Sequence, residues 1–141
     1  MGTFALLRVA TVSAQDMNPD DVPPELRTAF DQAYPDAGDV EWERDGESFK
    51  VEFETNRKDQ EVWYAADGKA AKTEKEIGEG ELPQTIKSAI AGKYADYKID
   101  SIEMTEEGGS ATYEVELEKG WDDEIQVVFD AEGKVLNEWK D

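Results

Sequence analysis

The chain repeats itself. When the second half is set against the first at an offset of about 60 residues, the same pattern of side chains returns. The aligned positions are Val22-Pro23 with Leu82-Pro83, Leu26 with Ile86, Tyr34 with Tyr94 and, at an offset of 65, residues 66–69 with 131–134. A pattern that occurs twice indicates one structural unit that folds twice. We therefore predict two tandem units over residues 18–80 and 81–141, joined by the charged segment 74–81.

Each unit begins with the pattern of a helix. Prolines at 23, 24 and 83 suit a first helical turn, where the missing N–H costs nothing. Leu26, Ala29, Phe30 and Ala33 follow at helical spacing, and the second unit repeats this spacing from residue 86. Pro35 biases the residue before it away from the helical conformation. We predict one amphipathic helix at the start of each unit.

After each helix the apolar period changes from 3.6 to 2, which indicates strands. Val40 and Trp42 alternate with acidic residues, and the alternation returns at 49–53, 62–64, 102–104, 113–117 and 125–129, with a last strand over 134–139. Glycines at 46, 68, 108, 109 and 133 mark the turns. The sequence thus predicts an α+β fold of two tandem helix-plus-antiparallel-sheet units, each with one helix followed by three to four strands. Trp42 and Trp139 are expected in the core.

Few residues are available for that core. Leu, Ile, Val and Phe account for 27 of 141 residues, and the formal net charge is −20, a composition that borders on disorder. The pattern removes this difficulty, because each predicted helix and sheet needs only one buried face. The 4 Trp, 5 Tyr and 5 Phe add large buried areas. A folded protein is therefore expected.

The first residues resemble a secretory signal. Residues 3–14 are apolar and end in Val12-Ser13-Ala14, small residues of the kind that signal peptidases cleave after. We predict that residues 1–17 are a signal-peptide remnant and leader, and that the protein is periplasmic or secreted. The alternative is an ordinary N-terminal strand or helix. The run is too short to span a bilayer, so no membrane insertion is expected.

Charge and missing residue types exclude several functions. The excess of acid disfavours binding to nucleic acid or to an anionic membrane surface. The absence of Cys and His removes thiolate and imidazole chemistry and the usual zinc ligands. Acidic residues at 20–21 and 122–124 lack the spacing of a calcium loop. We expect no enzyme activity, no catalytic residue, no cofactor and no specific metal site, only loosely bound cations.

The off-phase strand positions predict an acidic sheet face opposite the helices. Trp63 also lies off phase, and Trp121 falls in a predicted loop. Exposed tryptophans are frequent anchors of protein interfaces. The alternatives are that the acidic face is only a solvated surface, that Trp63 is covered, and that Trp121 folds over the sheet edge. The candidate partner-binding residues are Trp63, Trp121, Glu52, Glu54, Glu114 and Glu116.

Several motifs resemble a known family. They are the Val-Pro-Pro-x-Leu-Arg-x-Ala-Phe opening from Val22, the Phe49-x-Val51-x-Phe53 strand and the two x-Ala-Asp/Glu-Gly-Lys turns. They are similar to the PepSY-like proteins, also described as beta-lactamase-inhibitor-like, which are exported proteins of Bacteroidetes. The resemblance covers residues 22–139 and implies a non-catalytic exported protein that binds a ligand or inhibits. We expect recognition of a protein or peptide. The alternative is an acidic cation-binding or structural envelope protein.

Overall fold

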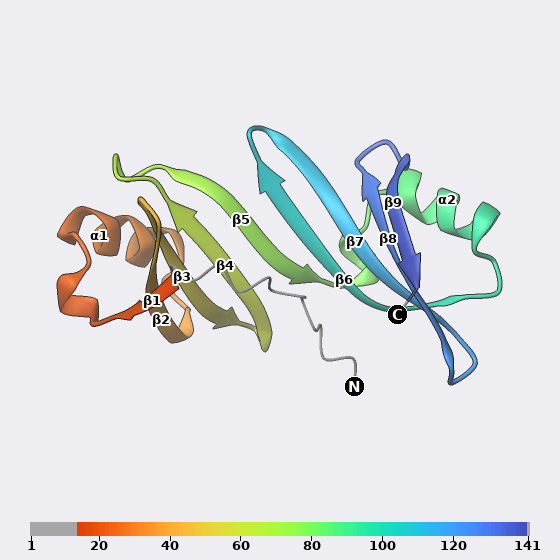
Figure 1. Cartoon of the computed structure of the whole chain (residues 1–141), viewed down its shortest axis with the longest axis horizontal. Coiled ribbons are helices and arrows are strands. Elements are labelled where there is room, and N and C mark those ends of the chain that lie inside the picture. The colour runs from red at the N-terminus through yellow and green to blue at the C-terminus, as the bar shows by residue number, and fades with distance from the viewer. Residues whose placement is uncertain (1–13, 141) are drawn as a thin grey trace. The chain divides into compact units, whose positions relative to one another are not determined.

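The computed structural model describes residues 14–140. They divide into two compact units, an N-terminal unit that ends at Lys75 and a C-terminal unit that begins at Glu76 (Figure 1). The described residues contain two α-helices and nine strands. The strands pair with antiparallel register within each unit. The prediction of a mixed fold with antiparallel sheet is therefore confirmed. Residues 1–13 of the predicted signal-peptide remnant and leader, 1–17, lie outside the described part of the chain.

The N-terminal unit places its strands in chain order, each beside the next. Its elements are β1 (Ala14–Met17), a 3-10 turn (Pro19–Asp21), α1 (Pro24–Ala33), β2 (Gly38–Asp45), β3 (Ser48–Thr55), β4 (Lys58–Tyr64) and β5 (Ala70–Ile77), whose last two residues belong to the C-terminal unit. Pro23 caps α1, and the helix buries Leu26 and Phe30. The Phe30 ring meets Trp42 and Phe53 edge-on, with centroids 5.6 and 5.0 Å apart. Trp42 thus belongs to the core, as predicted.

The C-terminal unit follows the same order of helix and strands. Its elements are a 3-10 turn (Glu79–Glu81), α2 (Gln84–Lys93), β6 (Lys98–Glu107), β7 (Ser110–Lys119), β8 (Asp123–Asp130) and β9 (Val135–Lys140). Ile86 and Ile90 of α2 join Val115, Val127 and Phe129 in one buried cluster. Each helix therefore covers one face of its own strands and leaves the other face, called here the outer face, free of helix.

The structure corrects two predictions about the core. Val40 is 37% exposed because a bulge between Gly38 and Glu41 shifts the alternation of β2. Trp139 is 38% exposed because its partner across the ladder is Gln126, an outer-face residue. The prediction that Trp139 lies in the core is wrong, since strand phase at the end of β9 is set by a second bulge, between Val128 and Phe129.

Two segments predicted to lack regular structure are ordered. The segment 74–81, predicted as a linker, lies largely in β5 and the second 3-10 turn, since Glu74 and Lys75 pair with β4. At the N-terminal end, Asp16 and Met17 of the predicted leader pair with Glu43 and Trp42. Both segments gain backbone hydrogen bonds from a neighbouring strand, which side-chain pattern does not encode.

Candidate functional site

Four glutamates form a line across the outer face of the N-terminal unit. Glu41 of β2 pairs directly with Glu52 of β3, Glu52 with Glu61 of β4, and Glu61 with Glu74 of β5. We call these four residues the glutamate row. Like charges directly opposite one another destabilise a sheet. The row therefore costs folding free energy, and its carboxylates form a concentrated negative surface.

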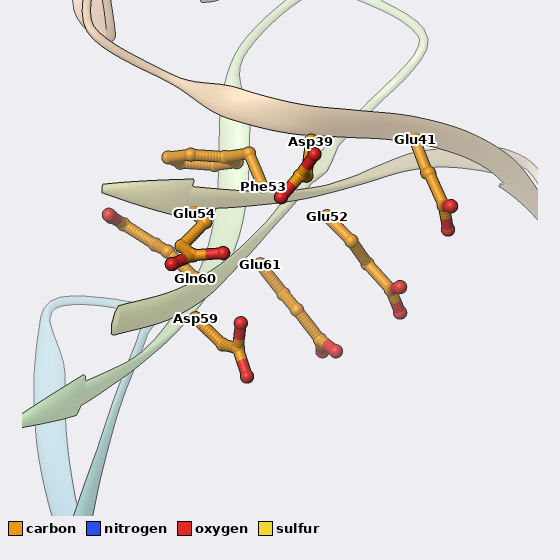
Figure 2. Close-up of a pocket in the computed structure, with 8 residues that line it drawn as sticks. All are labelled: Asp39, Glu41, Glu52, Phe53, Glu54, Asp59, Gln60 and Glu61. Carbon is orange, nitrogen blue, oxygen red and sulfur yellow. The ribbon is translucent and has the colours of Figure 1, made fainter. Parts of the chain in front are cut away.

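A pocket of about 310 Å³ lies at one side of this row. Figure 2 shows the carboxylates of Glu41, Glu52 and Glu61 projecting to the same side of the sheet, while the Phe53 ring lies on the other side of β3. We call this pocket the acidic pocket. Six of its eight lining residues carry a carboxylate. The lining residues are Asp39, Glu41, Glu52, Phe53, Glu54, Asp59, Gln60 and Glu61.

One buried lysine belongs to this face. Lys50 is only 6% exposed, and its Nζ lies 2.8 Å from Glu52 Oε1, 3.7 Å from Glu61 Oε1 and 3.8 Å from Glu43 Oε2. Within the described residues, no ion pair joins Glu54 or Asp59 to a lysine or arginine. The acidic pocket is therefore compensated at its Lys50 end and stays strongly negative at the other end.

Trp63 lies on the outer face, as predicted, but its ring is already engaged. Its Nε1 donates a hydrogen bond to Asp45 Oδ2 at 3.2 Å. The ammonium groups of Lys72 and Lys50 lie 4.7 and 5.4 Å from the ring centroid, within the range of cation–π attraction. The chain's own lysines thus hold the indole, and Trp63 is a half-buried part of the face rather than an open anchor.

Trp121 is different, because 93% of it is exposed. It stands in the loop between β7 and β8, beside Gly120, whose φ of +66° makes the turn. No ring or cation contact of this indole is found among the described residues. Of the two predicted aromatic contacts, Trp121 is the open one.

The outer face of the C-terminal unit does not repeat the glutamate row. The line across β6 to β9 consists of Ser101, Glu116, Gln126 and Trp139. Glu116 is 5% exposed, and Ser101 Oγ donates a hydrogen bond to its Oε2 at 3.1 Å. Glu114, on the same strand, is half-buried opposite Glu103. Glu116 is therefore enclosed and hydrogen-bonded inside the chain, which removes it from the accessible contact surface.

Burial raises the pKa of the Glu116 carboxyl above its ordinary value of 4.5. The folded chain then keeps this proton to higher pH than the unfolded chain, so stability decreases as the pH rises from about 4.5 through the raised pKa. We expect the free energy of unfolding of the wild type, minus that of Glu116→Gln, to fall over this interval. Urea titrations at successive pH values measure it. Glu118→Gln controls for the loss of one charge, and an equal pH dependence in both variants would contradict the prediction.

Among the described residues, no group of three or more acidic side chains is arranged to hold a metal ion. No described helix is long and apolar enough to cross a membrane.

Carboxylates on a sheet face accept hydrogen bonds from ammonium and guanidinium groups, and such charged hydrogen bonds are about twice as strong as neutral ones. The acidic pocket is thus suited to basic side chains.

The chain is similar to known proteins in sequence and in fold. A family model described as "Putative beta-lactamase-inhibitor-like, PepSY-like" matches residues 10–69 and 47–137. The structure is similar to that of a BLIP-like protein from Bacteroides fragilis, with a TM-score of 0.62 and 24% identity over 84% of this chain and 87% of that chain. It is also similar to that of a "putative periplasmic" protein from Bacteroides eggerthii, with a TM-score of 0.66 and 20% identity over 84% and 88%. At these identities the likeness shows the fold. Among curated proteins, none matches the chain.

Proposed function

The chain belongs to the PepSY-like, beta-lactamase-inhibitor-like family, and from this premise we propose that it is a non-catalytic, exported binding module for a cationic protein or peptide. Its contact surface is the acidic pocket of the N-terminal unit, with Trp121 as a separate aromatic contact. The periplasm or the extracellular space is the proposed location. The likeness to a protein described as periplasmic supports this assignment.

The acidic pocket is the observation that carries the proposal. Its carboxylates repel one another across the strands, so they lower the stability of the sheet. A cationic partner relieves this repulsion on binding, and its approach is accelerated by long-range attraction to a chain of net charge −20. A face that only keeps the protein soluble does not require six carboxylates around one pocket.

The two units are proposed to be copies of one tandem helix-plus-sheet unit, with the boundaries 18–80 and 81–141. Phe30 and Ile90 occupy the same buried position on their helices. Gly68 and Gly133 occupy the same turn position, with φ values of +86° and +88°. These equivalences allow one unit to serve as the control for the other in binding experiments.

A matched pair of triple variants tests the proposed function. Glu41→Gln, Glu54→Gln and Asp59→Asn together remove three of the six carboxylates that line the pocket, whereas Glu103→Gln, Glu118→Gln and Glu124→Gln remove three carboxylates from the outer face of the other unit. Isothermal titration with poly-lysine at low salt measures binding. We expect the pocket variant to bind about tenfold more weakly, a loss of about 1.4 kcal/mol, and the control variant to bind nearly as the wild type does.

Equal losses in the two triple variants would show attraction to net charge alone and would contradict the proposal. Calcium added at constant ionic strength tests the alternative function, that of a cation-binding protein. A rise in melting temperature with calcium, combined with equal poly-lysine binding by all three proteins, would favour a cation-binding protein. Trp121→Ala is measured in the same titration with a partner protein once one is identified.

A further inference from the structure

We propose that the dipeptide Asp45–Gly46 is a site of spontaneous isomerisation, at which the aspartate closes to a succinimide and reopens as isoaspartate. The chain contains two Asp-Gly dipeptides, Asp45–Gly46 and Asp67–Gly68. Glycine carries no side chain, so the amide nitrogen that follows each aspartate can approach the aspartate carboxyl without obstruction. As sequence the two dipeptides are equivalent, and only their surroundings in the fold distinguish them.

The reaction uses only the chain and water. The amide nitrogen of Gly46 bonds to Cγ of Asp45, and the proton of the nitrogen leaves with the carboxyl hydroxyl as one water. The five-membered imide then takes up one water again. Cleavage of its bond between Cγ and the nitrogen restores aspartate. Cleavage of the bond between the backbone carbonyl carbon of Asp45 and the nitrogen gives isoaspartate, whose main chain runs through Cγ.

The attacking nitrogen of Gly46 is not engaged. Gly46 is exposed in the short turn between β2 and β3, with a φ of +61°. Apart from its chain neighbours, a Cβ added here would meet no atom within 4 Å, so the turn has room to rotate. Within residues 14–140, the amide N–H of Gly46 donates no hydrogen bond. No competing acceptor therefore holds the nitrogen away from the carboxyl of Asp45.

The Asp67–Gly68 turn is held at both reacting groups. The amide of Gly68 donates a hydrogen bond to the oxygen of Ala65 at 2.9 Å, and Asp67 Oδ1 accepts one from the amide of Lys69 at 2.9 Å. The turn also packs against α1, because a Cβ on Gly68 would lie 3.6 Å from Leu26 Cδ2. Attack on Asp67 requires the hydrogen bond of Gly68 to break, so the fold protects this dipeptide.

One side-chain hydrogen bond restrains Asp45, and isomerisation removes it. Trp63 Nε1 donates to Asp45 Oδ2 at 3.2 Å. Isoaspartate lengthens the main chain by one methylene group and leaves the free carboxylate directly on Cα, so this acceptor is lost. The Trp63 ring also contacts Lys50 and Lys72. The modification therefore changes the outer face around Trp63, and Asp45 itself does not line the acidic pocket.

Peptide mapping of the full-length wild type, stored at mildly acidic pH, tests the proposal. Electron-transfer fragmentation distinguishes isoaspartate from aspartate at each dipeptide, and the loss of one water identifies the succinimide. We expect isoaspartate to form about fivefold faster at Asp45 than at Asp67, which corresponds to about 1 kcal/mol of activation free energy, the typical contribution of one hydrogen bond. In concentrated urea, where the fold is lost, the two rates should be nearly equal.

Two variants test the contacts. Trp63→Phe removes the donor to the Asp45 carboxyl and should accelerate isomerisation at Asp45 about threefold, with the rate at Asp67 unchanged. Asp45→Glu keeps the charge but can close only a six-membered ring, so residue 45 should no longer isomerise while Asp67 reacts as before.

Equal rates at the two dipeptides of the folded wild type, or a faster rate at Asp67, would overturn the proposal. A difference that persists in urea would overturn it as well, because neighbouring residues rather than the fold would then set the rates. An acceleration of equal size at both positions in Trp63→Phe would contradict the restraint that we assign to the Trp63 hydrogen bond, as would an unchanged rate at Asp45.

Discussion

Replacing Lys50 by Met should destabilise the N-terminal unit by about 2–4 kcal/mol, because removing one partner of a buried ion pair leaves uncompensated charge. Met keeps the length of the side chain, which is only 7% exposed, and removes its ammonium. The carboxylates of Glu43, Glu52 and Glu61 then face one another without their shared cation. The structure therefore assigns to Lys50 the largest electrostatic contribution on this face.

Urea unfolding followed by tryptophan fluorescence measures this effect. Trp42 is buried in the N-terminal unit, whereas Trp121 and Trp139 are exposed, so the change in emission on unfolding reports mainly on that unit. Lys72→Met is the matched control, because its side chain is 32% exposed and, among the described residues, its one ion pair is with Glu74. Solvent screens this pair more than it screens the pairs of Lys50, so a smaller loss of about 0–1 kcal/mol is expected. Equal losses for Lys50→Met and Lys72→Met would contradict the assigned role. Salt screens a buried pair much less than an exposed one, so the Lys50→Met loss should persist at high salt.

Replacing Gly133 by Ala should destabilise the C-terminal unit by about 2–4 kcal/mol, because two effects combine. The φ of Gly133 is +88°, a conformation that costs an L-residue about 1–2 kcal/mol. A Cβ at this position would also lie 2.6 Å from the backbone oxygen of Thr85. Thr85 Oγ1 donates a hydrogen bond to the oxygen of Ala131 in the same turn, so the turn cannot move away without losing it.

Gly109 supplies the control within the same unit. Its φ of +79° is similar, but an added Cβ meets nothing within 4 Å. Gly109→Ala should therefore cost only the backbone contribution of about 1–2 kcal/mol. Hydrogen exchange of α2 and β8 amides measures both variants in the C-terminal unit. If both variants lose the same protection, the contact between the turn and α2 does not constrain the unit.

Much of the fold could be predicted because local chemistry determines it. Helix α1 could be predicted from the prolines at its start and from the helical spacing of Leu26 and Phe30. The strands follow from alternation, and the turns from glycines with positive φ such as Gly46 and Gly108. The errors fall where the period is interrupted. The bulges in β2 and between β8 and β9 shifted Val40 and Trp139, and a bulge has no reliable signal in side-chain pattern.

The candidate site could be predicted only in part. Alternation placed Glu52 and Glu54 on the outer face, and both line the acidic pocket. The same alternation gave no reason to separate them from Glu116, which is buried. Asp59 was missed, although it stands two residues before Glu61 and so shares its face. That spacing was the available signal for the pair of Glu54 with Asp59.

The sequence by itself determined which residues form each helix and strand and which side of each strand is apolar, because backbone preference and burial act over a few neighbouring residues. Only the tertiary structure decided which acidic residues lie opposite one another, that Lys50 is buried among Glu43, Glu52 and Glu61, and that the turn at Gly133 leaves no room for a Cβ beside Thr85. These contacts depend on strand register and on the packing of a turn against a helix. Register is a property of two strands together, so no pattern within one strand contains it.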